Sequence, residues 1–226
     1  KARFPVQDKC VYTGNPTRPA IREAKRDESR KKLGIRPDDF MVLIAGGSRG
    51  ARNINNVMLG VHRHFKDTPG LCLYHVTGTR DYGNVLKELG EVDERGYYGS
   101  SSRIVDYQHD MPSAMAAADL VIYRAGAVGL AEVAVRGLPS ILIPYPYAAE
   151  DHQTYNARVF VAAGAAKMIE DKYLTAQELI QDIEELHNHK DVLAGMAEAA
   201  EKLGKASAGA DIAHMALELA GKKGER

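Results

Sequence analysis

The chain has 226 residues, and 30 basic side chains balance 30 acidic ones, so that its formal net charge at pH 7 is zero. This balance argues against a nucleic-acid-binding protein that depends on broad neutralisation of phosphates. The length permits a sizeable buried core, and no apolar run approaches the roughly 20 residues that a membrane span needs. Cys10 and Cys72 lie far apart and the histidines lack zinc-ligand spacing, so we expect a soluble protein without a metal site.

Short apolar runs alternate with amphipathic stretches along most of the chain. We predict helices over 52–64, 82–89, 112–118, 128–136 and 153–163, and strands over 40–45, 71–76, 103–107, 120–123, 140–144 and 165–169. This alternation implies right-handed crossovers and an α/β fold, a Rossmann-like doubly wound parallel sheet. The basic run over 22–32 is expected to be a solvated helix face, with anionic lipid as its alternative partner, and further helices are expected after 175.

Two glycine-rich turns are the most informative features of the sequence. The first is Gly46-Gly47-Ser48-Arg49-Gly50-Ala51, and the second runs from Arg124 through Gly126 and Gly129 to Glu132. Each follows a predicted strand and precedes a predicted helix, so each directs backbone N–H groups and a helix N-terminus at one place, as a phosphate site requires. The Glu132 carboxylate could accept both ribose hydroxyls of a nucleotide, or it could be an acid favoured by the helix dipole.

The residues around the turns separate the nucleotide-binding classes. A Walker loop needs Gly-Lys-Ser/Thr, whereas Gly50 is followed by Ala51 and Arg52. A dinucleotide fold expects an acidic residue after the second strand, whereas the run from Val76 to Arg80 contains none. The P-loop class is therefore disfavoured, and the dinucleotide class becomes the alternative to a different nucleotide.

Four motifs together make the sequence resemble the MurG-type glycosyltransferases. The motifs are Gly14-Asn15-Pro16-Thr17-Arg18, Gly46-Gly47-Ser48-x-Gly50-Ala51-Arg52-x-Ile54-Asn55, Arg124-x-Gly126-Ala127 leading to Glu132, and Asp151-His152-Gln153-Thr154-x-Asn156-Ala157. These bacterial hexosyltransferases add N-acetylglucosamine from UDP to lipid I, undecaprenyl-pyrophosphoryl-muramoylpentapeptide, and so form lipid II of peptidoglycan. The resemblance implies the carboxyl-terminal, donor-binding half of a two-domain GT-B glycosyltransferase, without the amino-terminal half that binds the acceptor.

The resemblance also assigns binding roles for UDP-N-acetylglucosamine. Glu132 would hold the ribose, His152 and Gln153 would bind sugar hydroxyls, and backbone around Gln108 would read the uracil edge. The groups implied at the phosphates are the Arg18 side chain, the Ser48 hydroxyl, and the backbone N–H groups of Ala127, Val128 and Gly129. The chain departs from the family at three positions of these motifs: Arg49 stands where many members carry Gln, Ala125 where Ser is common, and Gly129 where Thr is often found.

The resemblance implies no cofactor, no metal and no catalytic residue within this chain, because it places the general base in the missing half. That half would also dock on the cytoplasmic face of the inner membrane, where the lipid I acceptor resides, so the isolated domain is expected to be inactive. We expect residues 1–20 to enter from an interdomain connection, 21–221 to form the donor-binding domain and 222–226 to be a frayed tail. The alternatives are another GT-B enzyme, such as a glycolipid synthase or a UDP-sugar epimerase, and a non-catalytic nucleotide-sugar-binding module.

Overall fold

The computed structural model describes residues 9–47 and 51–224. Within them, a seven-stranded sheet has the order β3-β4-β2-β1-β5-β6-β7, and its neighbouring strands run parallel except for the antiparallel pair β3 and β4. The strands are β1 (Phe40–Ala45), β2 (Leu71–Val76), β3 (Tyr97–Tyr98), β4 (Ser102–Val105), β5 (Leu120–Tyr123), β6 (Ser140–Leu142) and β7 (Ala166–Met168).

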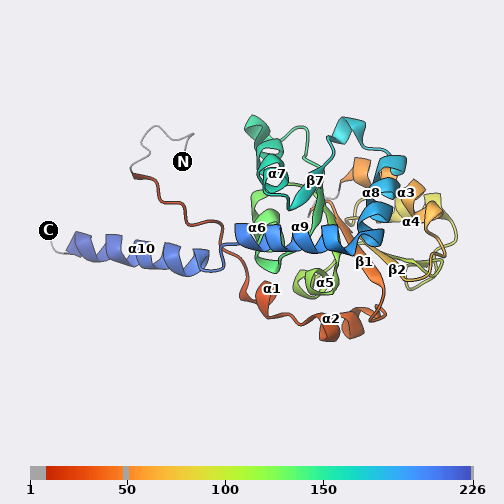
Figure 1. Cartoon of the computed structure of the whole chain (residues 1–226), viewed down its shortest axis with the longest axis horizontal. Helices are drawn as coiled ribbons and strands as arrows, with labels where there is room; N and C mark the ends of the chain where they lie inside the picture. The colour runs from red at the N-terminus through yellow and green to blue at the C-terminus, as the bar shows by residue number, and fades with distance from the viewer. Residues whose placement is uncertain (1–8, 48–50, 225–226) are drawn as a thin grey trace.

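Helices cover both faces of this sheet (Figure 1). They are α1 (Pro19–Glu23), α2 (Arg26–Leu33), α3 (Arg52–His64), α4 (Tyr82–Leu89), α5 (Met111–Ala117), α6 (Ala127–Arg136), α7 (His152–Ala162), α8 (Ala176–Asn188), α9 (Lys190–Leu203) and α10 (Ala208–Gly224), with short 3-10 turns η2 (Ala149–Asp151) and η3 (Asp171–Tyr173). One core cluster joins the sheet to α5, α6 and α7, and a second joins its other face to α3 and α8.

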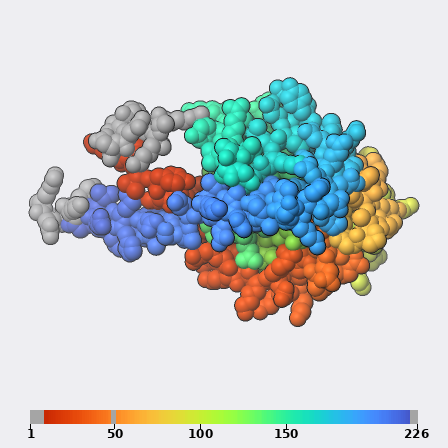
Figure 2. Space-filling view, viewed as in Figure 1, coloured from red at the N-terminus to blue at the C-terminus, as the bar shows by residue number. Residues whose placement is uncertain are grey.

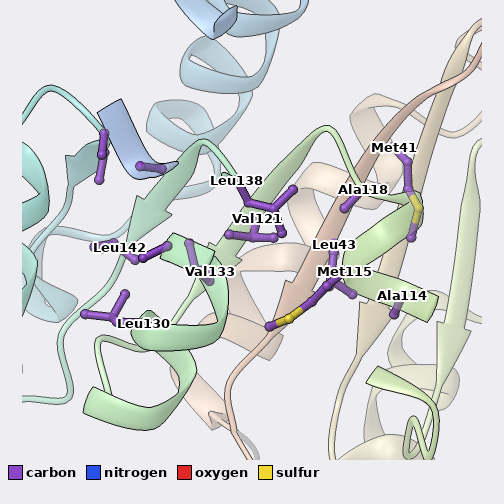
Figure 3. Packing of buried hydrophobic residues seen from close by; sticks show 14 of the residues in the cluster. Met41, Leu43, Ala114, Met115, Ala118, Val121, Leu130, Val133, Leu138 and Leu142 are labelled. Carbon is purple, nitrogen blue, oxygen red and sulfur yellow. The ribbon is translucent and has the colours of Figure 1, made fainter. Parts of the chain in front are cut away.

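Strand β1 shows why the sheet is covered on both sides. All six of its residues are buried, and its side chains alternate between the two core clusters. Met41 and Leu43 belong to the first cluster, where Figure 3 shows them near Met115 of α5 and, farther along the sheet, Val133 of α6. Because both faces of the strand pack against apolar side chains, its sequence is an uninterrupted hydrophobic run.

The structure confirms the predicted fold class and nearly all the predicted elements. The strands over 40–45, 71–76 and 120–123 and the helices over 52–64 and 82–89 have the predicted bounds, whereas the other predicted elements are shifted or shortened by a few residues. The two-residue edge strand β3 was not predicted. It follows Gly96, whose φ of 83° is in the left-handed region, and a strand this short leaves no alternation in the sequence.

The expectation of a solvated basic face over 22–32 is wrong for Arg30 of α2, whereas Arg26, with a side chain 40% exposed, is solvated in part. Arg30 is only 2% exposed, and its guanidinium donates to Oδ2 of Asp119 at 2.7 Å and to the backbone oxygen of Asp39 at 2.8 Å. Arg26 donates to Oδ1 of the same aspartate at 2.5 Å. A basic residue in a helix does not reveal whether a carboxylate elsewhere in the chain pairs with it. For that reason the buried Arg30 was expected to be exposed to solvent.

Helix α10 projects from the body of the molecule (Figure 1), and the segment before α1 lies beside its beginning (Figure 2). A β-carbon on Gly14 would lie 2.7 Å from the Cβ of Lys205, and the Lys205 ammonium lies over the Tyr12 ring at 6.0 Å from its centroid. Leu217 and Leu219 of α10 are about two-thirds exposed, at 69% and 65%. None of the described helices is both long and apolar enough to span a membrane.

Candidate functional site

The two glycine turns follow neighbouring strands, at the point where the order of the strands reverses. The chain proceeds from β1 outward to β2 and β4 on one side, and from β5 outward to β6 and β7 on the other, so that β1 and β5 are neighbours at the switch point. In open α/β sheets the ligand crevice lies at the carboxyl ends of the strands at this point. Gly46 and Gly47 follow β1, and the second turn follows β5; Ser48, Arg49 and Gly50 lie outside the described residues.

Helix α6 presents uncapped amide groups at this crevice. Its N-cap is Gly126, which has no side chain to accept a hydrogen bond from the first turn. The N–H groups of Ala127, Val128 and Gly129 have no partner within the helix, as is usual for a first turn, and the Val128 side chain is 61% exposed. The combination of free donors and the positive end of the helix dipole suits an anion.

Glu132 lies one turn farther along α6 and is paired with Arg18. Its side chain is 9% exposed, and its Oε1 accepts a hydrogen bond from Nε of Arg18 at 3.0 Å. The Arg18 side chain is 53% exposed, and the bond uses only Nε, which leaves its terminal nitrogens to donate elsewhere. A buried carboxylate such as that of Glu132 needs a counter-charge. Arg18 provides it while its own side chain stays half exposed, so that a cation lies next to the uncapped turn without being fully desolvated.

Two asparagines of the predicted motifs hold the second glycine turn from opposite sides. Nδ2 of Asn15 donates to the backbone oxygen of Ala127 at 3.2 Å, and Nδ2 of Asn156 donates to that of Ala125 at 3.1 Å. Both asparagines were part of the motif patterns, but the sequence alone gave them no role. Three of the four motifs therefore converge on this one turn.

A buried ion pair connects the helix after the first turn to the second turn. Oδ1 of Asp171 lies 2.5 Å from a terminal nitrogen of Arg124, and Nδ2 of Asn53 on α3 donates to Oδ2 of Asp171 at 3.0 Å. Arg124 also donates to the backbone oxygens of Ile143 and Pro144 at 3.2 and 3.0 Å. Sequence analysis quoted Arg124 only as part of a motif and missed Asp171, which no local pattern distinguishes.

A buried chain of hydrogen bonds fixes the start of α3 to the loop after β2. Nδ2 of Asn55 donates to the backbone oxygen of Thr77 at 2.8 Å, so its Oδ1 accepts from Nε2 of His75 at 3.0 Å. Nδ1 of His75 must then accept from Nε2 of His62, also at 3.0 Å. Burial lowers the pKa of His62 to about 3, and burial together with His62 lowers the pKa of His75 well below its ordinary value.

The predicted sugar-binding pair lies in the loop between β6 and α7. Glu150 and Asp151 both have φ of 51°, a left-handed conformation that is unusual outside glycine. Nδ1 of His152 lies 2.7 Å from the backbone oxygen of Ala149 and must carry the proton, which leaves Nε2 as an acceptor in the neutral ring. Oε1 of Gln153 accepts the backbone N–H of Tyr145 at 3.0 Å, so its amide nitrogen and one lone pair of Oε1 are left for a ligand.

Gln108 lies on the other flank of the crevice, in the loop after β4. Its Nε2 donates to the hydroxyl of Tyr74 at 2.7 Å, and its Oε1 accepts the backbone N–H of Asp110 at 2.9 Å. Both ends of the Gln108 side chain thus make a hydrogen bond within the protein.

The predicted residues thus fall into one cluster and two flanks. Arg18, Glu132 and the backbone of 127–129 come together at the second turn, whereas Gln108 and the pair His152 and Gln153 lie on neighbouring loops without a direct bond to that cluster. A cavity lined by Phe40, Asp119 and Pro139 lies at the opposite, amino ends of the strands and contains none of these residues. Within the described ranges, no cluster of three or more His, Cys, Asp or Glu side chains could hold a metal ion.

The chain is similar to several curated bacterial proteins over nearly its whole length. It is 44% identical over 202 residues to the UDP-N-acetylglucosamine--N-acetylmuramyl-(pentapeptide) pyrophosphoryl-undecaprenol N-acetylglucosamine transferase of Halothermothrix orenii, which covers 88% of this chain and 54% of the relative. The protein of the same name from Desulforudis audaxviator is 40% identical over 219 residues, covering 97% of the chain and 59% of the relative. The chain therefore spans somewhat more than half the length of these relatives.

Solved structures show the same fold at lower identity. A crystal structure of Acinetobacter baumannii MurG has a TM-score of 0.71 at 24% identity and covers 92% of this chain and 57% of that one. The structure described as an S. aureus MnaA-UDP co-structure has a TM-score of 0.68 at 16% identity and covers 96% and 57%, respectively.

The family comparison covers the sheet and most of the helices. Residues 41–214 match the family described as the glycosyltransferase family 28 C-terminal domain, a range that includes both glycine turns, Glu132 and the loop with His152 and Gln153. This match confirms the resemblance that the four motifs suggested, and the chain belongs to the glycosyltransferase family 28 C-terminal domain family.

Proposed function

We propose that this chain binds UDP-N-acetylglucosamine as the donor half of an inverting glycosyltransferase that converts lipid I into lipid II. The names of the relatives with 40–44% identity support the reaction, and the match to the glycosyltransferase family 28 C-terminal domain supports the donor role. Because the chain spans only 54–59% of those relatives, the acceptor and its binding groups are assigned to a second half.

The observation that carries this proposal is the uncapped start of α6 beside the pair of Arg18 and Glu132. A diphosphate would receive N–H groups from Ala127, Val128 and Gly129 and the free nitrogens of Arg18. The ribose would bind the Glu132 carboxylate, whose Oε2 is not used by Arg18. One acidic and one basic group at this spacing match the neutral and the anionic parts of a nucleoside diphosphate.

The same groups would stabilise the leaving group of the reaction. When the acceptor 4-hydroxyl attacks the anomeric carbon, the bond to the diphosphate breaks and negative charge builds up on UDP. The α6 N-terminus and Arg18 lie in place before this charge develops, as electrostatic catalysis requires, and the Ser48 hydroxyl is proposed to join them. The hydroxyl proton goes to a general base that we assign to the second half.

The flanking loops would select the base and the sugar. Backbone around Gln108 is proposed to read the uracil edge, while Nε2 of His152 and the amide nitrogen of Gln153 are proposed to bind sugar hydroxyls. These are one acceptor and one donor, respectively, so together they can distinguish hydroxyl orientations. The acceptor lipid would bring the assembled enzyme to the cytoplasmic face of the membrane as a peripheral protein.

Calorimetry with UDP and with UDP-N-acetylglucosamine, followed by a lipid II assay, tests this function. The chain alone is expected to bind both nucleotides and to produce no lipid II, and addition of the amino-terminal half of a relative is expected to restore synthesis. Absence of UDP binding would refute the donor role. Binding without restored synthesis would instead favour a nucleotide-sugar sensor or another GT-B enzyme, and turnover by the chain alone would contradict the assignment of the base to the second half.

A further inference from the structure

Gly129 is a glycine because of a neighbouring side chain rather than because of its backbone. A β-carbon built on it would lie 2.7 Å from Cε1 and 3.4 Å from Cδ1 of Tyr123, and its φ is not in the left-handed region. Real β-carbons essentially never approach another heavy atom this closely, so no larger residue fits while the Tyr123 ring stays in place. The ring therefore occupies the space into which a side chain at position 129, often Thr in MurG-type enzymes, would extend.

Tyr123 stands at the switch point of the sheet. It is the last residue of β5, it pairs with Ala45 at the end of β1, and Arg124 follows it directly in the second glycine turn. Since Gly129 and Glu132 are three residues apart on α6, they share one side of the helix, and the Tyr123 ring packs against that side. The side chain thus reaches from the sheet to the cluster that contains Glu132.

The electrostatics around the phenol agree with this position. Burial, reinforced by the Glu132 carboxylate and opposed by the Arg18 guanidinium, raises the pKa of Tyr123 to about 12. Both members of the ion pair therefore act on this hydroxyl. At neutral pH the hydroxyl keeps its proton and is a hydrogen-bond donor, and no hydrogen bond to it is recorded within the described residues.

We propose that Tyr123 is a further nucleotide-binding residue, whose ring replaces the side chain absent at Gly129 and whose hydroxyl donates a hydrogen bond to the ribose–diphosphate junction of the ligand. This inference rests on the proposed function, because it names an additional contact within the same nucleotide site. Tyr123 and Gly129 are then a compensating pair: Gly129 has no side chain to offer a hydroxyl, and Tyr123 at the end of β5 supplies one.

The first test compares Tyr123→Phe with the wild type by calorimetry with UDP. Removal of one hydroxyl should raise the dissociation constant about 3- to 10-fold, the range expected for a single hydrogen bond, without a change in melting temperature. Tyr98→Phe is the matched control, because Tyr98 is a buried tyrosine of the distant strand β3. This control should bind UDP as the wild type does.

The second test exchanges the pair. Gly129→Thr alone should lower both the melting temperature and UDP affinity, because the new side chain collides with the Tyr123 ring. In the double variant Tyr123→Ser and Gly129→Thr the space is open again, so its melting temperature should exceed that of Gly129→Thr and its UDP affinity should exceed that of Tyr123→Ser. Such a result is a coupling between the two positions that independent effects cannot give.

The outcomes separate this inference from the function on which it rests. If the wild type does not bind UDP, the proposed function itself fails. If the wild type binds UDP and Tyr123→Phe binds it equally well, only the role of Tyr123 is overturned. If Tyr123→Phe weakens UDP binding and also lowers the melting temperature, Tyr123 is a packing residue and the inference is likewise overturned. The same conclusion follows if the double variant melts no higher than Gly129→Thr or binds UDP no more tightly than Tyr123→Ser.

Discussion

Arg18 and Glu132 are separated by 114 positions, yet they form a bonded pair without any ligand. An exposed ion pair usually contributes little to stability, but Glu132 is buried, so its carboxylate depends on this partner. The pairing gives Arg18 a second role beside the proposed diphosphate contact. It neutralises and orients the buried Glu132 carboxylate, which is proposed to bind the ribose.

Glu132→Gln should weaken UDP binding with little effect on folding. The amide keeps the size of the side chain but loses the charge that strengthens hydrogen bonds to the ribose, which should cost about 1.5–3 kcal/mol of binding free energy. Calorimetry with UDP and a thermal melt measure the two effects. Glu91→Gln, a change in an exposed pair with Lys66, is the control, and an unchanged dissociation constant for Glu132→Gln would identify Glu132 as the ion-pair partner of Arg18 only.

Gln153 has two functional ends, and two variants separate them. Gln153→Ala removes the acceptor for the Tyr145 N–H and should cost about 0.5–1.5 kcal/mol of stability as well as sugar selectivity. Gln153→Glu keeps that acceptor and replaces the amide donor with a charged oxygen, so it should retain the stability, bind both UDP-sugars more weakly and still discriminate less between N-acetylglucosamine and N-acetylgalactosamine donors. Competition binding of the two UDP-sugars decides, and an unaltered preference in both variants would exclude Gln153 from the site.

The sequence indicated candidate residues for the site but not the bonds between them. Glycine turns, a carboxylate one turn inside a helix and the motif arginine can be recognised locally, because each depends on its position relative to a strand or a helix. That Arg18 would pair with Glu132, or that the Tyr123 ring would require Gly129, follows from side chains brought together by the fold. No spacing in the sequence encodes those contacts.

At the scale of elements, α2 is tied to the sheet by a shared aspartate. Asp119 precedes β5 and accepts from both Arg26 and Arg30, and its Oδ2 also accepts the backbone N–H of Met41 in β1. Burial lowers the pKa of Arg30 and the Asp119 carboxylate opposes this effect. One carboxylate thus neutralises a buried cation and orders the starts of two strands.

Asp119→Ala should therefore destabilise the protein strongly. Removal of one partner leaves the Arg30 charge buried and unpaired, which costs about 3–5 kcal/mol. Glu28→Gln changes the exposed pair with Lys25 on the same helix and should cost less than about 1 kcal/mol. Denaturant unfolding of both variants measures the difference, and similar losses would contradict the account of α2.

The buried histidines predict how stability responds to acid. His62 and His75 have lowered pKa values in the folded state, so below about pH 6.5 the unfolded chain binds more protons and the free energy of unfolding falls. Each histidine should contribute about 1.4 kcal/mol per pH unit, and for His62 this continues down to a pH of about 3. The stability that both provide is fully present above about pH 6.5.

Urea unfolding between pH 7 and pH 5 measures that slope. His62→Gln should reduce it by about 1 kcal/mol per pH unit on average over this range, because a histidine of the unfolded chain is only partly protonated near pH 6.5; this holds whatever the effect of the substitution on absolute stability. His214→Gln, a change on the exposed α10, is the control for removal of a histidine from the surface. A slope that His62→Gln leaves unchanged would mean that this side chain does not resist protonation in the folded protein.

At the scale of the whole molecule, the alternation of apolar runs and helices was sufficient to predict the architecture. A parallel sheet buried on both faces leaves long apolar runs such as Phe40–Ala45, and the strands over 40–45, 71–76 and 120–123 have the predicted bounds. The predicted domain boundary after residue 20 was drawn from the position of residues in the sequence, not from their contacts. Asn15 and Arg18 lie before that boundary and bond to α6 beyond it.

A chain shortened to residues 21–226 tests the importance of that segment. It loses Asn15 and Arg18, leaves the Glu132 carboxylate buried without its counter-charge, and should melt at a lower temperature and bind UDP more weakly than the full chain. A chain beginning at residue 9 is the control and should retain both properties. Equal UDP affinity in the two would show that the segment before α1 is dispensable for the site.

The contact between Gly14 and Lys205 gives this segment an influence beyond its own length. The stretch that carries Arg18 packs against the residues just before α10, so a displacement of α10 would shift Arg18 and, if Arg18 binds the diphosphate as proposed, the affinity for the nucleotide. Thermodynamic coupling between two positions is reciprocal. If the placement of α10 alters affinity for UDP, then UDP must alter the placement of α10 by the same free energy, and the projecting helix becomes a reporter of an occupied donor site.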